Sequence, residues 1–390
     1  MRIALFSDTY PPEINGVAIH VKALKEGLES LKNEVLVVTT NADGKESREE
    51  SILHCPSIKL KRIYGYGMSM PINVKQYNII RNFNPDVIHI HTEFGIGLFG
   101  IFVAKMLKKP IVYTLHTIYD DYVYYVMPKP FVKTGQNVFY KYIRMISKNA
   151  TVITGPSEKS HEYLKLAGIK RDIEVIPNPV DVNKFNSSNV TINEINEIRE
   201  RYKIPKNAFV ACVITRIGKE KSIDVLIDYI AEYVKVNPNF KFLIVGDGPS
   251  KNELEKQAKA LGLDDIVIFV GKVPNSELLP YYAVSDAFLT ASLSDTNSIS
   301  MLEAMSMGLP ILQRSDPINE GQVIEGVNGF IFSDNQSFIN KLDYLCNLNF
   351  NDRLELKKSV RRSVISSNTK NSTAQKLCDV YKKAMLLYNS

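Results

Sequence analysis

Residues 210–245 read VACVITRIGKEKSIDVLIDYIAEYVKVNPNFKFLIV, and this stretch decides the fold class. Its two ends, 210–215 and 241–245, are short apolar runs rich in Val, Ile and Phe, which is typical of buried strands. Between them, apolar residues recur at helical spacing over 221–236. A strand, a helix and a second strand in this order predict a βαβ unit with parallel strands.

The same alternation extends outward through both halves of the chain. Further strand-like runs lie at 3–6, 35–39, 87–90, 111–115, 152–154, 266–270, 287–290 and 310–312, and helical patterns such as 17–30, 97–107 and 251–261 separate them. Alternating strands and helices predict doubly wound parallel sheets, which bind ligands at the carboxyl ends of their strands. We therefore expect an α/β protein of two Rossmann-like domains that face a cleft.

Prolines and polar residues suggest the domain boundaries. Ile176-Pro177-Asn178-Pro179-Val180-Asp181 and the polar stretch 186–193 read as a linker. We expect a first domain over 1–180, a second over 190–365, and a helical segment over 366–390 that can pack back on the first domain. Its helix is expected at about 373–387, after a polar break.

Composition fits an ordinary protein with cores: 390 residues, 45% hydrophobic and 23% charged. The longest apolar stretch, 94–104, is too short to cross a bilayer, which takes about 20 residues. The run 3–6 is too short for a secretory signal, and the four cysteines are scattered, so a reduced, cytoplasmic protein is expected. Residues 1–180 hold 23 Lys+Arg and 17 Asp+Glu, a net +6, whereas the other 210 hold 25 of each. This asymmetry favours an acidic partner for the first half.

Two loops carry features suited to phosphate. Arg216 and Lys221 follow a strand and precede a helix, an arrangement that suits a diphosphate. The alternative is that both are loop cations that only contact solvent. Gly16, near the start of the first helix, would let backbone approach a ligand closely, unless it is only a turn residue. No G-x-G-x-x-G fingerprint is present there, so a nicotinamide cofactor is not suggested.

The segment 294–310 pairs two acids around a helix start. Asp295 and Glu303 can hold sugar and ribose hydroxyls, and the backbone N–H groups near Ser298 and Ile299 can hold phosphate. Acids in a first turn are also ordinary helix caps. Upstream, the strand end reaching Val273 can offer backbone groups to a nucleobase, or be a simple turn.

These motifs, taken in order, resemble the retaining family 4 glycosyltransferases, which have the two-domain GT-B architecture. The elements that carry the resemblance over essentially the whole chain are Pro11-Pro12 with Asn15-Gly16-Val17, Pro85-Asp86-Val87-Ile88-His89, Thr114-Leu115-His116, Ile176 to Asp181, Arg216 with Glu220-Lys221, Gly246-Asp247-Gly248-Pro249, Leu302-Glu303-Ala304-Met305 and Gly326-Val327-Asn328-Gly329-Phe330. The resemblance implies a hexosyltransferase that uses a nucleotide-sugar as substrate.

The resemblance also implies roles for single residues. Gly16, Arg216 and Lys221 would hold the diphosphate, Glu303 the ribose and Asp295 the transferred sugar, with His116 beside the anomeric carbon; the alternative for His116 is a satisfied polar residue at a strand end. No cofactor and no metal are expected, since the sequence has no Asp-x-Asp motif and no evident histidine cluster.

Three departures from the family pattern affect the sugar site. Asp295 stands where Glu is usual, and Ser298 stands where Gly is usual. Residues 315–322 stand where the family has a Gly-rich loop that contains an acid. They leave sugar specificity open and motivate one rival interpretation, a non-catalytic partner subunit.

Within the family, residues 113–125, including Tyr119, look like the diacylglycerol glycosyltransferases. Residues 122–157 contain no acid and five cations, namely Lys129, Lys133, Lys141, Arg144 and Lys148. In the expected helix, Val138, Tyr142 and Met145 form a stripe, with Phe139, Ile143 and Ile146 beside it and the cations on another side. An apolar stripe flanked by cations suits an anionic bilayer surface, unless the stripe is domain core.

The sequence thus predicts transfer of a hexose, glucose from UDP-glucose or else galactose from UDP-galactose, to diacylglycerol. The enzyme would bind peripherally to the inner face of the cell membrane. The rival acceptors are a soluble sugar, a polymer, or a phosphoinositide with a GDP-sugar donor. Nucleic acid is disfavoured, because no recognition motif accompanies the charge.

Overall fold

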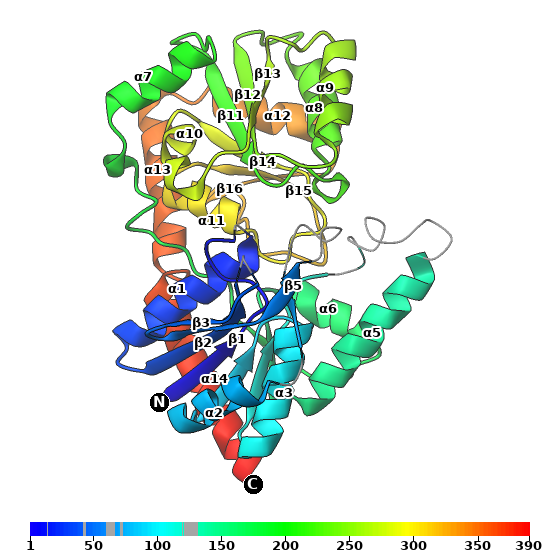
Figure 1. Ribbon diagram of the computed structural model, residues 1–390. Helices are drawn as coiled ribbons and strands as arrows, with labels where there is room; N and C mark the ends of the chain where they lie inside the picture. The colour runs from blue at the N-terminus through cyan, green and yellow to red at the C-terminus, as the bar shows by residue number, and fades with distance from the viewer. Residues whose placement is uncertain (14, 42–43, 60–66, 71–72, 119, 121–131) are drawn as a thin grey trace. The chain divides into compact units, whose positions relative to one another are not determined.

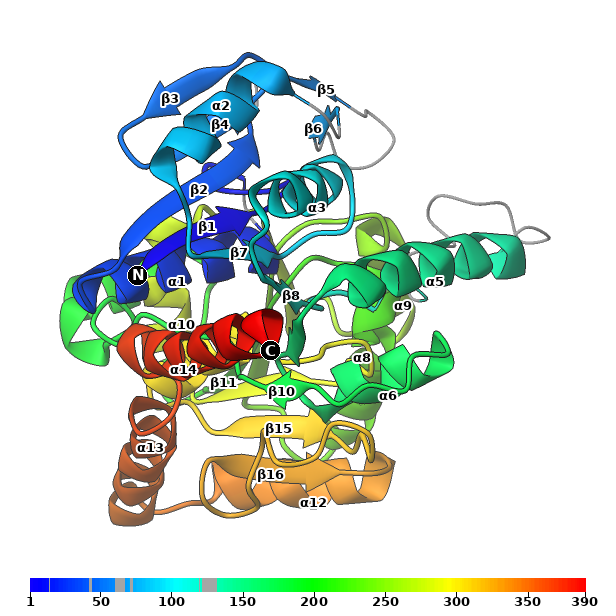
Figure 2. The same ribbon diagram turned by 90° about the horizontal axis from the view of Figure 1, so that it is seen from below.

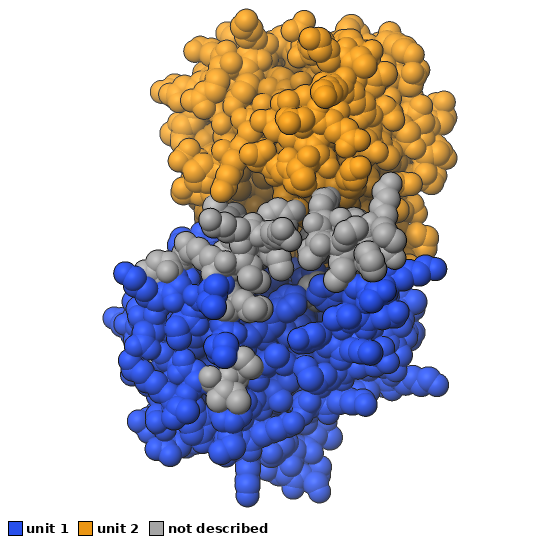
Figure 3. Space-filling model, turned by 45° about the vertical axis from the view of Figure 1, so that its right-hand side comes forward, with its two compact units in different colours: residues 1–179, 370–390 blue, residues 180–369 orange. Residues whose placement is uncertain are grey.

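The computed structural model describes residues 1–13, 15–41, 44–59, 67–70, 73–118, 120 and 132–390. The chain forms two compact units (Figures 1 and 3). Unit 1 comprises Met1–Pro179 and Lys370–Ser390, and unit 2 comprises Val180–Thr369. Each unit is built around its own parallel sheet, as the alternation of strands and helices predicts.

Unit 1 contains a sheet in the order β10-β9-β8-β7-β1-β2-β4-β3, in which only the β3–β4 pair is antiparallel. Its strands are β1 (Arg2–Phe6), β2 (Glu34–Thr40), β3 (Ser47–Glu49), β4 (Ile52–Cys55), β7 (Val87–Ile90), β8 (Ile111–Thr114), β9 (Val152–Gly155) and β10 (Glu174–Val175); β5 (Ser57–Lys59) and β6 (Gly67–Ser69) form a separate hairpin. The chain turns to opposite sides of β1 when it adds β2 and β7. The carboxyl ends of β1 and β7 are therefore the expected ligand-binding edge of this unit.

Helices cover both faces of the unit 1 sheet (Figures 1 and 2). They are α1 (Gly16–Ser30), α2 (Val74–Phe83), α3 (Gly95–Leu107), α5 (Val132–Asn149), α6 (Glu158–Leu166) and α14 (Lys370–Asn389). Successive side chains of β1 point to opposite faces. Ile3 and Leu5 join the core that α1 and α14 cover, whereas Ala4 and Phe6 join the core under α3 and α5.

The last helix, α14, is an integral part of unit 1. It packs beside α1 and buries one side of its length against the sheet. Its buried residues are Thr373, Ala374, Leu377, Cys378, Val380, Tyr381 and Ala384. The hydroxyl of Tyr381 also lies 2.7 Å from Nδ1 of the buried His89 on β7. The helix starts at Lys370, three residues before the start expected from the sequence.

Unit 2 has a fully parallel sheet in the order β13-β12-β11-β14-β15-β16. Its strands are β11 (Phe209–Ile214), β12 (Phe240–Val245), β13 (Val267–Gly271), β14 (Ala287–Thr290), β15 (Ile311–Arg314) and β16 (Gly329–Phe332). Numbered from β11, this is the order 3-2-1-4-5-6 of the Rossmann fold. The strand order reverses between β11 and β14, so their carboxyl ends mark the expected binding crevice.

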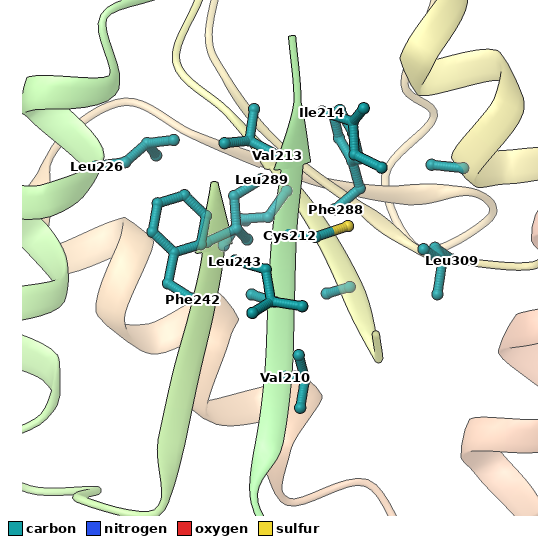
Figure 4. Close-up of a cluster of buried hydrophobic side chains, with 14 of the residues drawn as sticks. Val210, Cys212, Val213, Ile214, Leu226, Phe242, Leu243, Phe288, Leu289 and Leu309 are labelled. Carbon is teal, nitrogen blue, oxygen red and sulfur yellow. The ribbon is translucent and has the colours of Figure 1, made fainter. Parts of the chain in front are cut away.

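The unit 2 core consists of the strands and the apolar sides of their helices (Figure 4). Cys212 of β11, Leu243 of β12 and Phe288 of β14 are at most 1% exposed, and Leu226 belongs to the same core. The helices are α7 (Ile192–Arg201), α8 (Ile223–Tyr233), α9 (Lys251–Ala260), α10 (Leu279–Ala283), α11 (Ile299–Ser306), α12 (Asn335–Cys346) and α13 (Phe350–Ile365), with 3₁₀ turns η3 (Ser187–Asn189), η4 (Lys219–Lys221) and η5 (Asn275–Glu277).

Every strand expected from the sequence is present, with ends that differ by at most two residues. The helix expected over 221–236 is shorter at both ends: it begins as the 3₁₀ turn η4, and α8 itself runs from Ile223 to Tyr233. Ser222 between them has a left-handed φ of 48°, which no continuous helix can accommodate. In the part of the chain that the structure describes, none of the helices has the length and apolar character needed to cross a membrane.

Candidate active site

The loop after β11 carries both cations that the sequence singled out. Arg216 is bound through Nη2 to a carboxylate oxygen of Glu220, whose side chain is fully buried. The Arg216 side chain itself stays 28% exposed. Burying a carboxylate is costly unless a cation pairs with it, so Glu220 fixes where the guanidinium sits. Arg216 is thus held at the carboxyl end of β11, where the strand order reverses.

Lys221 and Asp295 come together from two loops. The Lys221 ammonium lies 2.5 Å from Oδ1 of Asp295, which follows β14. The hydroxyls of Ser292 and Ser294 also donate to the backbone oxygen of Glu220 at 3.2 Å. Three contacts therefore join the loop after β11 to the loop after β14. This arrangement brings a cation expected at phosphate next to an acid expected at the sugar.

Glu303 lies inside unit 2, one turn into α11, and is only 4% exposed. The Tyr282 hydroxyl from α10 donates to its Oε2 at 2.8 Å. Burial raises the pKa of Glu303 to about 7, while the hydrogen bond from Tyr282, the charge of Lys184 and a hydrogen bond from Asn275 oppose that shift. A buried carboxylate with remaining acceptor capacity is suited to bind hydroxyl groups.

The start of α11 explains one departure from the family pattern. Ser298 is its N-cap, and the Ser298 side chain accepts from the backbone N–H of Met301. Ile299 is the first helical residue, so the free N–H groups of the first turn follow Asp295 closely in the sequence. Asn319, from the replaced loop 315–322, donates to the backbone oxygen of Asp295 at 2.8 Å. The altered loop therefore positions Asp295, a role that the sequence analysis missed.

The other two predicted donor-binding residues are Val273 of unit 2 and Gly16 of unit 1. Val273 follows β13 at the end of the sheet order, where it packs partly buried against the unit 2 core. Gly16 belongs to unit 1 and is the first residue of α1, after the N-cap Asn15, whose side chain accepts from Ala18 N. Each is at the carboxyl end of a strand or the start of a helix, as expected.

His116 stands in a cluster of histidines that the sequence analysis did not foresee. His20 of α1, His91 after β7 and His116 after β8 bring their ring nitrogens within 4.8 Å of one another. His91 Nδ1 lies 3.0 Å from His116 Nε2, and the ring centroids of His20 and His116 are 4.5 Å apart. Burial lowers the pKa of all three, for His20 to about 4, so they are neutral at neutral pH. The expectation that no such cluster exists was wrong. The three histidines are far apart in sequence, and only the order of the strands brings them together.

Two acids share the same edge of unit 1. Asp8, directly after β1, is buried and accepts hydrogen bonds from the Thr92 hydroxyl at 2.6 Å and from Ile96 N at 3.0 Å. Burial raises its pKa. The pKa of Glu13 is raised to about 7, mainly by burial and also by the charge of Asp8. Their position after a switch-point strand is a signal that sequence reasoning could have used.

Helix α5 divides its apolar residues between two environments. Ile143 and Ile146 are fully buried, and Phe139 packs against the same core. The stripe Val138, Tyr142 and Met145 is instead 37–43% exposed. The domain-core interpretation therefore holds for the first set and fails for the stripe.

The cations of α5 are also on its outer surface. Lys133, Lys141, Arg144 and Lys148 are exposed. Among the residues that the structure describes, none of these four has a carboxylate within salt-bridge distance. Lys129 and Tyr119, which the sequence also assigned to the acceptor side, lie outside the described residues. The exposed side of α5 is thus apolar and basic together.

Comparison with known proteins identifies relatives over most of the chain. Residues 14–184 match the family described as Glycosyltransferase Family 4, and residues 194–363 match Glycosyl transferases group 1. The chain is 35% identical over 353 residues to the alpha-monoglucosyldiacylglycerol synthase of Acholeplasma laidlawii, covering 88% of each chain. It is 31% identical to the enzyme of the same name from Streptococcus pneumoniae, covering 85% of this chain and 75% of that one.

The fold has solved counterparts. The structure of Anabaena Alr3699/HepE in complex with UDP superposes with a TM-score of 0.73 at 18% identity, over 98% of this chain and 100% of that one. The WaaG glycosyltransferase involved in lipopolysaccharide biosynthesis superposes with a TM-score of 0.68 at 14% identity, over 98% and 99% of the two chains. These likenesses agree with the two Rossmann-like units.

Proposed function

We propose, because the chain belongs to the family 4 glycosyltransferases, that it is a retaining enzyme moving glucose from UDP-glucose to 1,2-diacylglycerol in a membrane. The resemblance read from the sequence is confirmed, and the protein is a hexosyltransferase. The observation that carries the choice of acceptor is the similarity to two alpha-monoglucosyldiacylglycerol synthases over most of the chain.

The geometry of unit 2 supports binding of the donor there. The Arg216 guanidinium and the Lys221 ammonium stand at the switch point of the sheet, followed by the free N–H groups at the start of α11. Such groups stabilise the negative charge that develops on a leaving diphosphate. Glu303 would bind the ribose and Asp295 the glucose. The acceptor hydroxyl then attacks from the face that the diphosphate leaves, which retains the anomeric configuration.

The exposed side of α5 supports a peripheral membrane location. Apolar side chains that reach solvent between exposed cations suit the boundary of an anionic bilayer. Binding of this kind is reversible and needs no spanning helix. It would bring the acceptor-binding unit to the depth at which the free hydroxyl of diacylglycerol lies.

A panel that combines different donors with different acceptors tests the proposal. UDP-glucose, UDP-galactose and a GDP-sugar are each offered with diacylglycerol in anionic vesicles, with phosphatidylinositol vesicles, or with soluble sugars, and products are identified by mass spectrometry. We expect a glucosylated diacylglycerol from UDP-glucose. If a product forms only with another acceptor, that acceptor replaces diacylglycerol in the proposal. If no donor is turned over, a non-catalytic partner subunit is favoured.

Substitutions of the two acids of unit 2 are expected to have different effects. Glu303→Ala should weaken binding of free UDP, because a ribose contact is lost in the ground state. Asp295→Ala should chiefly lower turnover, because its partner is the reacting sugar. Isothermal calorimetry with UDP and steady-state kinetics separate the two. UDP binding by the Glu303 variant at parental affinity would refute the ribose role.

Removing charge from α5 is expected to weaken membrane binding. The variant Lys141→Gln, Arg144→Gln and Lys148→Gln loses three cations, each worth up to about 1 kcal/mol near an anionic surface and less in salt. We expect roughly tenfold weaker co-sedimentation with anionic vesicles and a parallel loss of lipid glucosylation, with UDP binding unchanged.

A matched variant controls for net charge. Lys235→Gln, Lys256→Gln and Lys259→Gln remove three exposed cations from unit 2 and should leave vesicle binding near the parental level. If both triple variants bind vesicles as the parent does, α5 is not the membrane surface.

A further inference from the structure

The histidine cluster of unit 1 has the composition of a transition-metal site. His20, His91 and His116 each offer one ring nitrogen, and these nitrogens lie within 4.8 Å of one another. In a tetrahedral site with metal–nitrogen bonds of about 2.0–2.1 Å, ligand nitrogens are about 3.3–3.4 Å apart. The His91–His116 pair, at 3.0 Å, is already close to that spacing. The other nitrogens would have to approach by at most about 1.5 Å to reach it, which rotation of the rings can supply.

The hydrogen bond between His20 and Asn178 leaves the other ring nitrogen of His20 available to such an ion. Nδ1 of His20 donates to the Asn178 side-chain oxygen at 2.8 Å, which places the lone pair of His20 on Nε2. That Nε2 is buried and has no hydrogen-bond partner among the described residues. Across the cluster, His91 Nδ1 and His116 Nε2 face each other at 3.0 Å, and both would bind the ion in place of their contact with each other. A buried polar atom without a partner is costly and calls for an explanation.

The neighbouring His89 provides the contrast. Its Nδ1 bonds the Tyr381 hydroxyl at 2.7 Å and its Nε2 bonds the Thr114 hydroxyl at 2.6 Å. Both of its nitrogens are therefore engaged, and it is a structural residue. The three cluster members differ from it in that ring nitrogens face one another across the cluster.

We propose that His20, His91 and His116 bind one borderline transition-metal ion such as Zn²⁺, with the fourth coordination position open on the side of the partly exposed His116. Imidazole suits Zn²⁺, Co²⁺, Ni²⁺ and Cu²⁺, whereas Mg²⁺ and Ca²⁺ prefer oxygen ligands, which this set lacks. Asn178 acts as the outer residue that orients a ligating histidine. Three protein ligands and one open position are a frequent arrangement for zinc.

The ion would act as an inhibitor rather than a cofactor. This consequence rests on the proposed function, in which His116 lies beside the reacting carbon. An ion on the His116 ring would occupy the space and the nitrogen that the sugar needs. Sugar transfer itself uses no metal in this scheme, so chelation should restore activity.

Cobalt titration of the full-length protein tests the site without reference to activity. Co²⁺ bound by three nitrogens with low coordination number absorbs visible light far more strongly than the hydrated ion. We expect these bands to saturate at one equivalent, to disappear when Zn²⁺ is added, and to be lost in His20→Ala and His91→Ala. His161→Ala removes a histidine on α6 outside the cluster and should keep them.

The parent protein decides the question even if a cluster variant folds poorly, which far-UV circular dichroism would reveal. Absence of the bands in the parent overturns the proposal, as does their persistence in folded His20→Ala and His91→Ala. Bands that vanish only in His161→Ala would assign the metal to the surface of α6. If the bands behave as expected but Zn²⁺ leaves transfer unaffected, the metal site stands and the placement of His116 at the reacting carbon is wrong.

Discussion

Replacement of Lys221 with alanine is expected to lower the rate of glucose transfer by about 10²-fold or more. Lys221 lies at the switch point of the unit 2 sheet, with its ammonium 2.5 Å from Asp295. Loss of one fixed charge from a leaving group typically costs this much, because the charge develops mainly in the transition state. Asp295 remains 26% exposed, so water can solvate it in the variant and the fold should survive.

Arg216→Ala should reduce transfer to a similar extent, but its loss also leaves the buried Glu220 without its cation. Removing one partner of a buried pair destabilises a fold strongly. Arg216→Lys keeps a charge near Glu220 and is the better variant, because lysine cannot reproduce the fork geometry that a diphosphate and a carboxylate share.

Lys219→Ala is the matched control for both substitutions. It lies in the same 3₁₀ turn as Lys221, yet 69% of its side chain is exposed and its contact with Glu253 is at the surface. Steady-state rates with UDP-glucose and diacylglycerol vesicles should be near parental for Lys219→Ala. Parental rates in Lys221→Ala and Arg216→Lys as well would show that the diphosphate is stabilised elsewhere.

Truncation of Leu377 to alanine is expected to lower the free energy of unfolding of unit 1 by about 2–5 kcal/mol. Leu377 is 1% exposed and packs from α14 into the core formed by β1, β2 and α1. A buried leucine loses its transfer free energy and leaves a cavity when it is shortened. A single domain is stable by only about 5–15 kcal/mol, so this is a large part of the total.

Leu386→Ala is the corresponding control on the same helix, since Leu386 is 74% exposed. Its effect should stay within about 0.5 kcal/mol. Urea unfolding, followed by circular dichroism with UDP present to stabilise unit 2, measures both. Equal small effects would mean that α14 contributes little to the stability of unit 1.

The strands that were predicted each carry their own signal in the sequence. In β11 all six residues are apolar and buried, so the pattern reads as a buried parallel strand without any knowledge of its neighbours. β3, which reads Ser-Arg-Glu, lies at the edge of its sheet and is largely exposed, so no apolar pattern marks it. The start of α8 was missed for a related reason, since a 3₁₀ turn has nearly the same residue spacing as a helix.

The site was predictable only where its residues follow one another in sequence. The loop with Arg216 and Lys221 and the loop with Asp295 were identified because each follows a strand-like run and precedes a helix. The contact between Lys221 and Asp295, 74 residues apart, depends on β11 lying beside β14. The same holds for the histidine cluster, which strand order alone brings together, and for Asn319, whose amide acts on the backbone of Asp295.

The most direct test of glucosyl transfer with retention is the structure of the lipid product. The full-length protein is incubated with UDP-glucose and diacylglycerol in anionic vesicles, and the extracted lipid is examined by mass spectrometry and by proton NMR of the anomeric position. We predict one hexose added to diacylglycerol, with the α configuration of the donor. A β-linked product, or consumption of UDP-glucose with no glucosylated diacylglycerol, would contradict the account.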